Sequence, residues 1–458
     1  MDIEFIKKYE TRAPRYTSYP PANFFTEKVD NEIYKQQIVD SNSRNPQNIS
    51  LYVHIPFCPQ LCNFCGCTTF FNSDEQRVKR YVSALETEIK NVASLLDTKR
   101  PVTQIHWGGG TPNALKTSVI DKIINIFAKY FNISVDAEIA MECNPAYMDL
   151  NDIKDYNSIG FNRLSLGIQD FDEKILNIIN RKSSKLPVNQ LIEQMHSLGM
   201  KGINLDLVYG LPCQTENSFV DSVNKAIETG ADRIVTFSYA HVPWVKPAQK
   251  VLESKGLPTA EQKISMFSAA NDVLTKKGYF FIGMDHYCKP NDELSYALQN
   301  GMLKRNFQGY CTSRTTGQVY GFGATSISQL FGSYIQNIKN PEDYMQSIET
   351  NGFAVSRGYV LDFNQIICRE VIGEVMCNGK LNFAICADRL SVDVQTIKKS
   401  IDYDVNKFLK FINDGILTAN EDGLELKRDA IFAVRNVAVL LDPMMKNNEK
   451  MFYRDVYK

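Results

Sequence analysis

The sequence has almost no net charge, because its 51 lysine and arginine residues are balanced by 52 aspartate and glutamate residues. A formal net charge of −1 gives no electrostatic footprint for nucleic acid or anionic lipid. The chain also has no uninterrupted apolar run of membrane-spanning length, and residues 1–10 contain no apolar signal core. We therefore expect a protein that binds neither nucleic acid nor a membrane.

Few cysteines lie close to one another in the sequence, although the 458-residue chain contains eleven of them. An odd number without a small disulfide framework favours a reducing compartment, so we expect a cytoplasmic protein. Most of these cysteines are single, and only Cys58, Cys62, Cys65 and Cys67 lie close together. The length predicts one large domain and a smaller one, and 44% hydrophobic with 22% charged residues is ordinary for a globular protein.

The four neighbouring cysteines follow a predicted core strand. Residues 49–55 are apolar and rich in β-branched side chains, and Pro56 ends the run. Thiolates on one short loop suit an iron–sulfur cluster or zinc better than a hard cation. Zinc usually uses cysteines in pairs with a second pair downstream, and none is found here. Three cysteines can hold three irons of a [4Fe–4S] cluster and leave one iron open, so we favour the cluster over a zinc loop or unligated thiols.

Short apolar runs alternate with amphipathic helical stretches up to about residue 245. The predicted strands are 49–55, 102–107, 137–143, 162–168, 202–208 and 232–240. A capping box at 73–76 begins one helix, and another helix runs from about Glu216 until Gly230 stops it. This alternation predicts an α/β fold with a parallel sheet, either doubly wound or closed into a barrel. In both cases the active site lies at the carboxyl ends of the strands.

Polar residues and glycines stand at those predicted ends. Gly108–Gly110 and Thr111 follow the second strand, and three glycines let the backbone approach a ligand closely, although a tight turn is the alternative. Glu142 lies in an apolar run and needs a partner, which a structural ion pair could also supply. Gln169 and Asp206 are single polar residues of a kind that is often only structural. Several strands ending in polar side chains favour a site over coincidence.

The cysteine spacing resembles the signature of the radical S-adenosylmethionine (SAM) superfamily. Residues 52–67, 282–287 and 305–310 are similar to phrases of one branch, the oxygen-independent coproporphyrinogen III oxidases. The resemblance implies an incomplete parallel (β/α)6 TIM-like barrel, an N-terminal extension and a smaller, mainly helical C-terminal domain. The corresponding boundaries are 1–48 for an extension that covers the site, 49–345 for the barrel and 346–458 for the C-terminal domain.

The resemblance also implies roles for individual residues. Cys58, Cys62 and Cys65 would bind the [4Fe–4S] cluster, whereas Cys67 would be needed for activity without being a ligand. A larger set would contact SAM: Tyr52, Phe64, Gly109, Gly110, Thr111, Glu142, Gln169, Arg181, Asp206, Ala240 and Ile327. The second SAM would lie near Phe64 and Cys67.

The implied activity is the oxidative decarboxylation of two propionates of coproporphyrinogen III to the vinyl groups of protoporphyrinogen IX. It would use two SAM molecules per turnover, an electron donor and an electron acceptor, neither of which the sequence identifies. The alternative within the superfamily is a haem chaperone, which usually lacks a cysteine at position 67. We expect a monomer, because no heptad pattern or exposed apolar helix is found.

Overall fold

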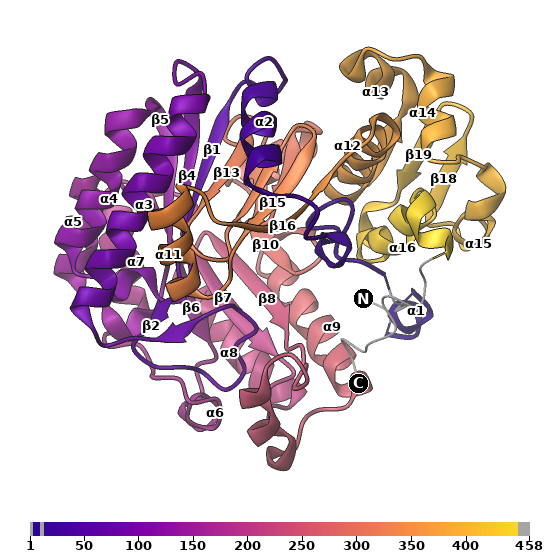
Figure 1. Cartoon of the computed structure of the whole chain (residues 1–458). Helices are drawn as coiled ribbons and strands as arrows, with labels where there is room; N and C mark the ends of the chain where they lie inside the picture. Colours follow the sequence, from indigo (N-terminus) through magenta and orange to yellow (C-terminus); the bar gives the residue numbers. More distant parts are fainter. Residues whose placement is uncertain (1–2, 10–12, 448–458) are drawn as a thin grey trace.

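The computed structural model describes residues 3–9 and 13–447. Its central feature is one mixed sheet with twelve strands in the order β16-β15-β14-β13-β1-β4-β5-β6-β7-β8-β10-β9 (Figure 1). None of the helices in the described ranges is both long enough and apolar enough to span a bilayer.

The six predicted strands form the middle of this sheet and run parallel, which confirms the α/β class. They are β1 (Ile49–Ile55), β4 (Pro101–Gly109), β5 (Asn132–Cys143), β6 (Arg163–Gln169), β7 (Asn204–Tyr209) and β8 (Arg233–Ser238). Parallel strands bring their carboxyl ends to the same edge of a sheet. The cysteine loop that follows β1 therefore shares an edge with the glycine run after β4.

Further strands extend the sheet on both sides. On one side β13 (Gln318–Phe322) pairs parallel with β1 as a seventh parallel strand that the sequence did not reveal. It is followed by the antiparallel strands β14 (Ile327–Leu330), β15 (Ser333–Asn337) and β16 (Val355–Val360). On the other side β10 (His286–Cys288) pairs antiparallel with β8, and β9 (Phe280–Gly283) pairs antiparallel with β10.

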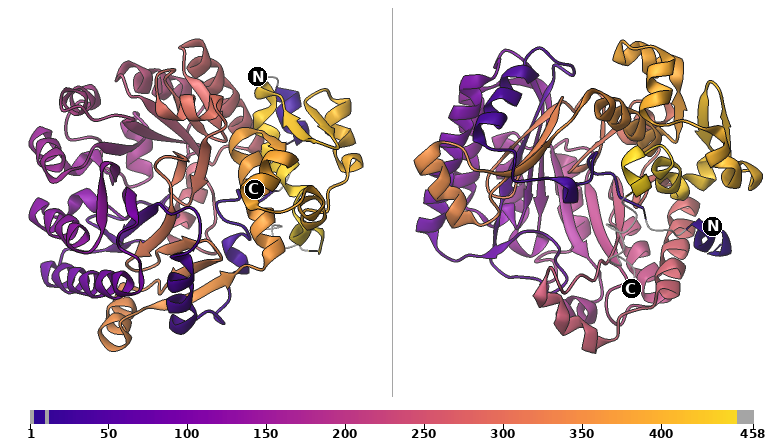
Figure 2. Two further views of the ribbon diagram at one scale, coloured as in Figure 1. Left: turned by 90° about the horizontal axis from the view of Figure 1, so that it is seen from above. Right: turned by 45° about the vertical axis from the view of Figure 1, so that its right-hand side comes forward.

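Helices cover one face of the parallel strands (Figures 1 and 2). They are α3 (Glu75–Leu95), α4 (Thr117–Tyr130), α5 (Leu150–Ile159), α7 (Val188–Ser197) and α8 (Glu216–Glu228). Helix α6 (Glu173–Ile178) lies apart from this layer (Figure 1), and its Ile175 and Leu176 belong to a separate apolar cluster with Val208 and Leu211. Alternate strand residues such as Trp107 and Leu205 are fully buried in the same core as Leu85 of α3. Successive side chains of a strand point to opposite faces of the sheet. The other face, called the inner face here, therefore carries the remaining strand residues, which include polar ones such as Glu142 and Asp206.

The structure shows at which residues two of the predicted helices begin. Helix α8 begins after a capping box formed by Thr215 and Ser218, and Gly230 follows it with φ 80°. The capping box predicted to begin at Ser73 is wrong. Asp74 is the N-cap of α3 and accepts a hydrogen bond from the Gln76 amide at 2.8 Å, which places the first helical residue one position later.

The C-terminal residues form a second group with its own core (Figure 2). It contains α12 (Phe363–Asn378), α13 (Phe383–Leu390), α14 (Val394–Ser400), α15 (Leu409–Asn413) and α16 (Val434–Val439). Strands β18 (Leu417–Asn420) and β19 (Gly423–Leu426) form a hairpin, to which β17 (Lys380–Asn382) adds a third strand. The position of the boundary expected after residue 345 lies in α11 (Pro341–Asn351), and β16, which follows it, pairs with β15.

The N-terminal extension contacts both groups. Its helices are α1 (Ile3–Tyr9) and α2 (Asn31–Ser41). The Tyr16 and Tyr19 hydroxyls donate to the Asp442 carboxylate at 2.9 and 3.1 Å, and both rings are buried in the C-terminal core. Thr26 forms a β-bridge with Gly358 of β16. The extension is therefore held both by the C-terminal group and by β16 of the sheet.

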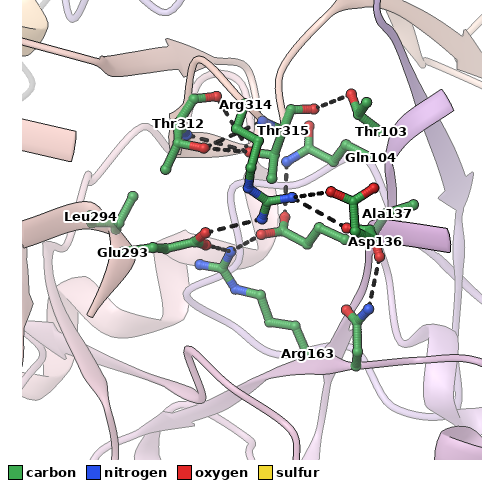
Figure 3. A network of polar contacts seen from close by, with 12 residues as sticks. Thr103, Gln104, Asp136, Ala137, Arg163, Glu293, Leu294, Thr312, Arg314 and Thr315 are labelled. Atoms are coloured by element: carbon green, nitrogen blue, oxygen red, sulfur yellow. Dashed lines mark hydrogen bonds and ion pairs between the residues drawn. The ribbon is translucent and has the colours of Figure 1, made fainter. Parts of the chain in front are cut away.

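A polar network occupies the amino-terminal end of the inner face (Figure 3). Arg314, which follows β12 (Gly309–Thr312), bonds to Asp136 at 3.3 Å and Glu293 at 3.4 Å. Glu293 also meets Arg163 of β6 at 3.6 Å. The hairpin of β11 (Leu303–Asn306) and β12 is thus fixed against the starts of the strands, opposite the edge that carries the cysteine loop.

Candidate active site

The cysteine loop is held between two segments of the chain. On one side the Gln60 amide donates to the carbonyl of Asn180 at 3.0 Å, and the Asn180 amide donates back to the Leu61 carbonyl at 2.8 Å. The Asn63 N–H bonds to the Ile179 carbonyl at 2.9 Å. On the other side the Lys246 ammonium donates to the Cys67 carbonyl at 2.6 Å. The backbone of the loop is therefore held by contacts from both sides.

The glycine run packs directly against this loop. The Gly110 N–H donates to the Ile55 carbonyl at 2.7 Å, and the Thr111 N–H donates to the Phe57 carbonyl at 2.9 Å. A Cβ at position 110 would lie 2.6 Å from the Phe57 oxygen and 3.0 Å from Cys58 Sγ. The Thr111 hydroxyl lies 3.4 Å from the same sulfur. The glycines thus allow β4 to approach the cysteine loop, in addition to any contact with a ligand.

Glu142 has the partners that its position required. Its Oε1 lies 3.2 Å from His106 Nε2, and its Oε2 accepts the Gly109 N–H at 3.3 Å. Tyr52 stacks on the His106 ring with centroids 6.1 Å apart. Burial would raise the Glu142 pKa, but His106, the Gly109 N–H and His54 together hold it below its ordinary value. Glu142 is therefore an ionised carboxylate at the edge of the sheet.

Asp206 lies in a different electrostatic setting. The Asn204 amide donates to its Oδ1 at 2.7 Å, and the Ser165 hydroxyl donates to its Oδ2 at 3.2 Å. Burial raises the Asp206 pKa to about 7, and the charge on Glu142 adds to this effect. The two carboxyl groups therefore differ in charge near neutral pH, since one is ionised and the other is close to half protonated.

Arg181 joins the cysteine loop to the end of β6. Its guanidinium donates to the Gly167 carbonyl and lies 3.8 Å from Cys62 Sγ. A Cβ at Gly167 would lie 2.7 Å from Gln169 Nε2, so the glutamine amide occupies the space beside this glycine. Gln169 has φ 71°, a left-handed conformation that is uncommon for a side-chain-bearing residue and frequent at functional sites.

A buried glutamine connects the end of β8 with the cysteine loop. The Gln249 side-chain amide donates to the Phe64 carbonyl at 2.9 Å and to the Ala240 carbonyl at 3.3 Å. Its Oε1 accepts the Val242 N–H at 2.6 Å, and the residue is 1% exposed. Two predicted site residues that lie far apart in the sequence are therefore bridged by one side chain.

The position of Ile327 relative to the other predicted site residues follows from strand pairing. It begins β14, an antiparallel strand outside the parallel set. Its backbone lies 2.9–3.1 Å from the position that a Cβ on Gly321 would occupy, and Gly321 is the partner of Tyr52 in the β1–β13 pair. Ile327 is therefore level with Tyr52 in the sheet, although its side chain packs with Phe25 and Tyr334.

The cysteine loop fits a [4Fe–4S] cluster. Cys62 and Cys65 are partly exposed, whereas Cys67 is exposed and its thiol bonds to Cys65. That hydrogen bond lowers the Cys65 pKa to about 6. In the described ranges, no three His, Cys, Asp or Glu side chains are arranged as ligands of a single ion. A cluster places each cysteine on a different iron, so its ligand sulfurs need not converge.

Several residues of the site were not found from the sequence. His106, Ser165 and Asn204 point to the inner face with Glu142 and Asp206, and strand alternation at positions 104, 106 and 108 was a signal that could have revealed His106. No pattern marked Gln249, because its partners are carbonyl groups of distant segments. His241, which follows β8, bonds to Tyr239 at 2.9 Å and to Glu253 at 3.1 Å.

Comparisons with known proteins agree with this geometry. The model of the radical SAM superfamily matches residues 52–226. An oxygen-independent coproporphyrinogen III oxidase of Synechocystis is 37% identical over 463 residues, covering 99% of this chain and 97% of the relative. The Escherichia coli protein of the same name is 35% identical, covering 98% of this chain and 97% of the relative.

A solved structure extends the agreement to the fold. Coproporphyrinogen III oxidase from Escherichia coli, described as a radical SAM enzyme, superposes with a TM-score of 0.88 at 34% identity. The match covers 97% of this chain and 99% of the solved one. The chain belongs to the oxygen-independent coproporphyrinogen III oxidases of the radical SAM superfamily.

Proposed function

We propose that this protein oxidatively decarboxylates two propionates of coproporphyrinogen III to the vinyl groups of protoporphyrinogen IX in anaerobic haem biosynthesis. The observation that carries the proposal is the cysteine loop at the carboxyl edge of the parallel strands, in a chain that matches such oxidases from end to end. The relatives reported above carry the oxidase name, and none of them is a haem chaperone.

The cofactors are a [4Fe–4S] cluster and SAM. Cys58, Cys62 and Cys65 would hold the cluster in this proposal, which would leave one iron open for SAM. When bound, the cluster would supply the electron for the reductive cleavage of SAM, and SAM would be the source of the radical chemistry at a propionate β-carbon. Loss of carbon dioxide and of one electron to an acceptor then leaves the vinyl group.

The residues of the chain position these groups. Gly109, Gly110 and Thr111 lie against the cysteine loop and are assigned to the amino end of SAM, where the ionised Glu142 carboxylate provides an acceptor. Arg181 fixes Cys62 and faces Gln169, which is assigned to the same ligand.

The remaining assignments surround these. The Tyr52 ring stacks on His106, which bonds to Glu142, and Asp206 lies on the neighbouring part of the inner face. Phe64 and Ala240, bridged by Gln249, and Ile327 complete the proposed SAM contacts. Cys67, exposed beside the ligand cysteines, is assigned to activity and not to the cluster.

Broader features complete the proposal. The six parallel strands with their helices represent the incomplete (β/α)6 barrel of the superfamily, which is consistent with β1 and β8 having β13 and β10 as their outer neighbours. Two SAM molecules are used per turnover by a cytoplasmic monomer that binds no membrane. An electron donor reduces the cluster, and a separate acceptor takes the electron from the substrate.

The test is an anaerobic turnover experiment. The reconstituted protein is mixed with dithionite, SAM, coproporphyrinogen III and a cell extract as electron acceptor, and products are identified by mass spectrometry. Protoporphyrinogen, deoxyadenosine and methionine are expected together. Deoxyadenosine without decarboxylated porphyrinogen would retain radical SAM chemistry and overturn the substrate. Tight haem binding without either product would favour the chaperone.

A further inference from the structure

Two of the segments that resemble the coproporphyrinogen oxidases, residues 282–287 and 305–310, have no role in the assignments above. The structure packs these two segments against each other. The Tyr310 ring meets the His286 ring edge-on, with centroids 5.0 Å apart, and the Arg305 guanidinium lies 5.6 Å from the centre of the Tyr310 ring. The two segments therefore form one unit, and His286 lies where they meet.

A neighbouring carboxylate fixes the orientation of the His286 ring. Its Nδ1 lies 2.7 Å from Asp285 Oδ1, and Asp285 Oδ2 accepts the Arg15 guanidinium at 2.5 Å. Burial would raise the pKa of Asp285, but Arg15 and His286 hold it well below its ordinary value. An ionised carboxylate can only accept hydrogen bonds, so Nδ1 of His286 carries the hydrogen in this pair.

The register of the sheet places His286 at the level of the proposed SAM site. Asp206 of β7 pairs with Val235 of β8, and Val235 pairs with His286 of β10. Paired residues of neighbouring strands point to the same face, so His286 projects from the inner face with Asp206. Two strand spacings, or roughly 10 Å, separate β7 from β10 at this level. The charge on Asp285 also contributes to the raised pKa of Asp206, which agrees with this proximity.

The second ring nitrogen of His286 is open to a ligand. Within the ranges that the structure describes, Nε2 bonds to no other group, and the side chain is 17% exposed. A Cβ at position 309 would lie 3.5 Å from Nε2, so Gly309 leaves one side of this nitrogen uncovered. Because Nδ1 donates to Asp285, Nε2 of the neutral ring is a hydrogen-bond acceptor. The inner face therefore presents an oriented acceptor.

An acceptor at this position selects a ligand that donates a hydrogen bond. The propionates of the proposed substrate are ionised near neutral pH and have no hydrogen to donate, whereas its four pyrrole N–H groups are donors. Aromatic rings adjoin the acceptor on two sides, since Phe237 meets the His286 ring edge-on at 6.2 Å and Tyr310 does so at 5.0 Å. Such rings pack well against the flat face of a pyrrole.

We infer that His286 binds a pyrrole N–H of coproporphyrinogen III through Nε2, and that Asp285 positions the ring for this contact. The inference rests on the proposed function, because it names a substrate contact of that same site. His286 touches the macrocycle, whereas Asp285 acts only through His286. The contact orients the macrocycle on the inner face beside Asp206 and leaves the cysteine loop clear.

The experiment measures the binding of coproporphyrinogen III and of its tetramethyl ester to the reconstituted full-length protein. Anaerobic equilibrium dialysis without SAM avoids turnover, and the bound ligand is quantified by fluorescence after oxidation to the porphyrin. In His286→Asn the amide can still bond to Asp285 but ends short of the Nε2 position. The affinity should fall roughly 5- to 150-fold for the acid and the ester alike, because both have the same pyrrole N–H groups. In His286→Gln the amide oxygen reaches the Nε2 position and should recover part of the loss.

Asp285→Asn tests the positioning role. An asparagine amide can donate to Nδ1, which moves the ring hydrogen to Nε2 and removes the acceptor, so the affinity should fall as in His286→Asn. The double variant should bind no more weakly than His286→Asn alone, because both changes act on one contact. Additive losses would show that Asp285 acts independently of His286 and would overturn its assignment.

The matched control is His196→Asn. His196 of α7 lies 3.2 Å from Asp232 in the helix layer, on the opposite face of the sheet, so this variant should bind like the wild type. Iron content and thermal unfolding show whether each variant is folded, and Asp285→Asn carries the test if His286→Asn is not. Unchanged affinity in a folded variant would overturn the inference. A loss confined to the tetra-acid would indicate a carboxylate contact and would overturn the pyrrole assignment. The proposed function fails separately, if the wild type forms no protoporphyrinogen in the turnover experiment.

Discussion

Replacing Gly110 with alanine tests whether the glycine run builds the cluster site and does not only contact SAM. The added Cβ would lie 2.6 Å from the Phe57 oxygen, 2.9 Å from the Phe57 carbonyl carbon and 3.0 Å from Cys58 Sγ. An ordinary contact begins at 3.4 Å, so the backbone must move by about 0.8 Å, which is 3.4 minus 2.6. The hydrogen bonds from Gly110 and Thr111 to Ile55 and Phe57 oppose this movement.

The expected cost follows from these contacts. Overpacking of this kind costs about 1–3 kcal/mol, and metal–ligand distances tolerate displacements of only about 0.2 Å. Because Cys58 is the first proposed cluster ligand, the strain should appear as a cluster affinity that is about 5- to 150-fold weaker. The assay measures iron and sulfide per chain and the chelator concentration that removes the cluster, before any SAM is added.

The control is Gly373→Ala. Position 373 lies in α12, and a Cβ there meets no atom within 4 Å, so this variant should gain up to about 1 kcal/mol of stability from helix propensity and keep its full iron content. A Gly110→Ala protein with wild-type iron content and chelator resistance, but weaker SAM binding, would refute the reasoning. Position 110 would then be a ligand contact only.

Three further predictions concern other parts of the site. The folded-state pKa of Asp206 is raised to about 7 from the ordinary 3.8, so the folded protein binds the proton more tightly than the unfolded chain does, and this contribution to stability should be lost as the pH rises from about 4 to 7. Denaturant titrations should therefore show that Asp206→Asn gains stability relative to the wild type over that pH range. Parallel stability curves for the two proteins would contradict this prediction. Gln249→Ala removes three hydrogen bonds and should destabilise the region around the cysteine loop by about 2–3 kcal/mol, seen as faster hydrogen exchange near Phe64, whereas unchanged exchange would show that the bridge is dispensable. Cys67→Ser should keep the cluster spectrum and lower decarboxylation, and a lost cluster signal would identify Cys67 as a ligand.

The sequence was sufficient for the features that depend on local pattern. Strands β1 and β4–β8 lie close to the predicted ranges, and Val82, Leu85 and Ile89 lie at helical spacing on the buried face of α3. The hairpin of β18 and β19 is closed by the local turn from Asn420 to Gly423. These elements are encoded by neighbouring residues, so periodicity and turn chemistry were enough.

The sequence was insufficient where distant segments meet. Strand β13 pairs with β1 although the two are separated by most of the large domain, and no local pattern specifies such a partner. For the same reason no local pattern shows that β16, which follows the predicted boundary at residue 345, joins the sheet through its pairing with β15. At the site, Gln249 binds carbonyl groups that every residue possesses, so its partners could not be read from side-chain chemistry.

The three consecutive glycines show how one short motif meets several spatial constraints. A Cβ at Gly108 would lie 2.9 Å from the Glu142 carboxylate, and one at Gly109 would lie 2.6 Å from the His54 ring. Gly110 instead faces Phe57 and the Cys58 sulfur. Each glycine therefore makes room for a different group of the site, and two of these groups, Glu142 and His54, lie on strands of the central sheet. The glycine run is thus better explained by close packing that fixes the cysteine loop in advance than by flexibility of the loop.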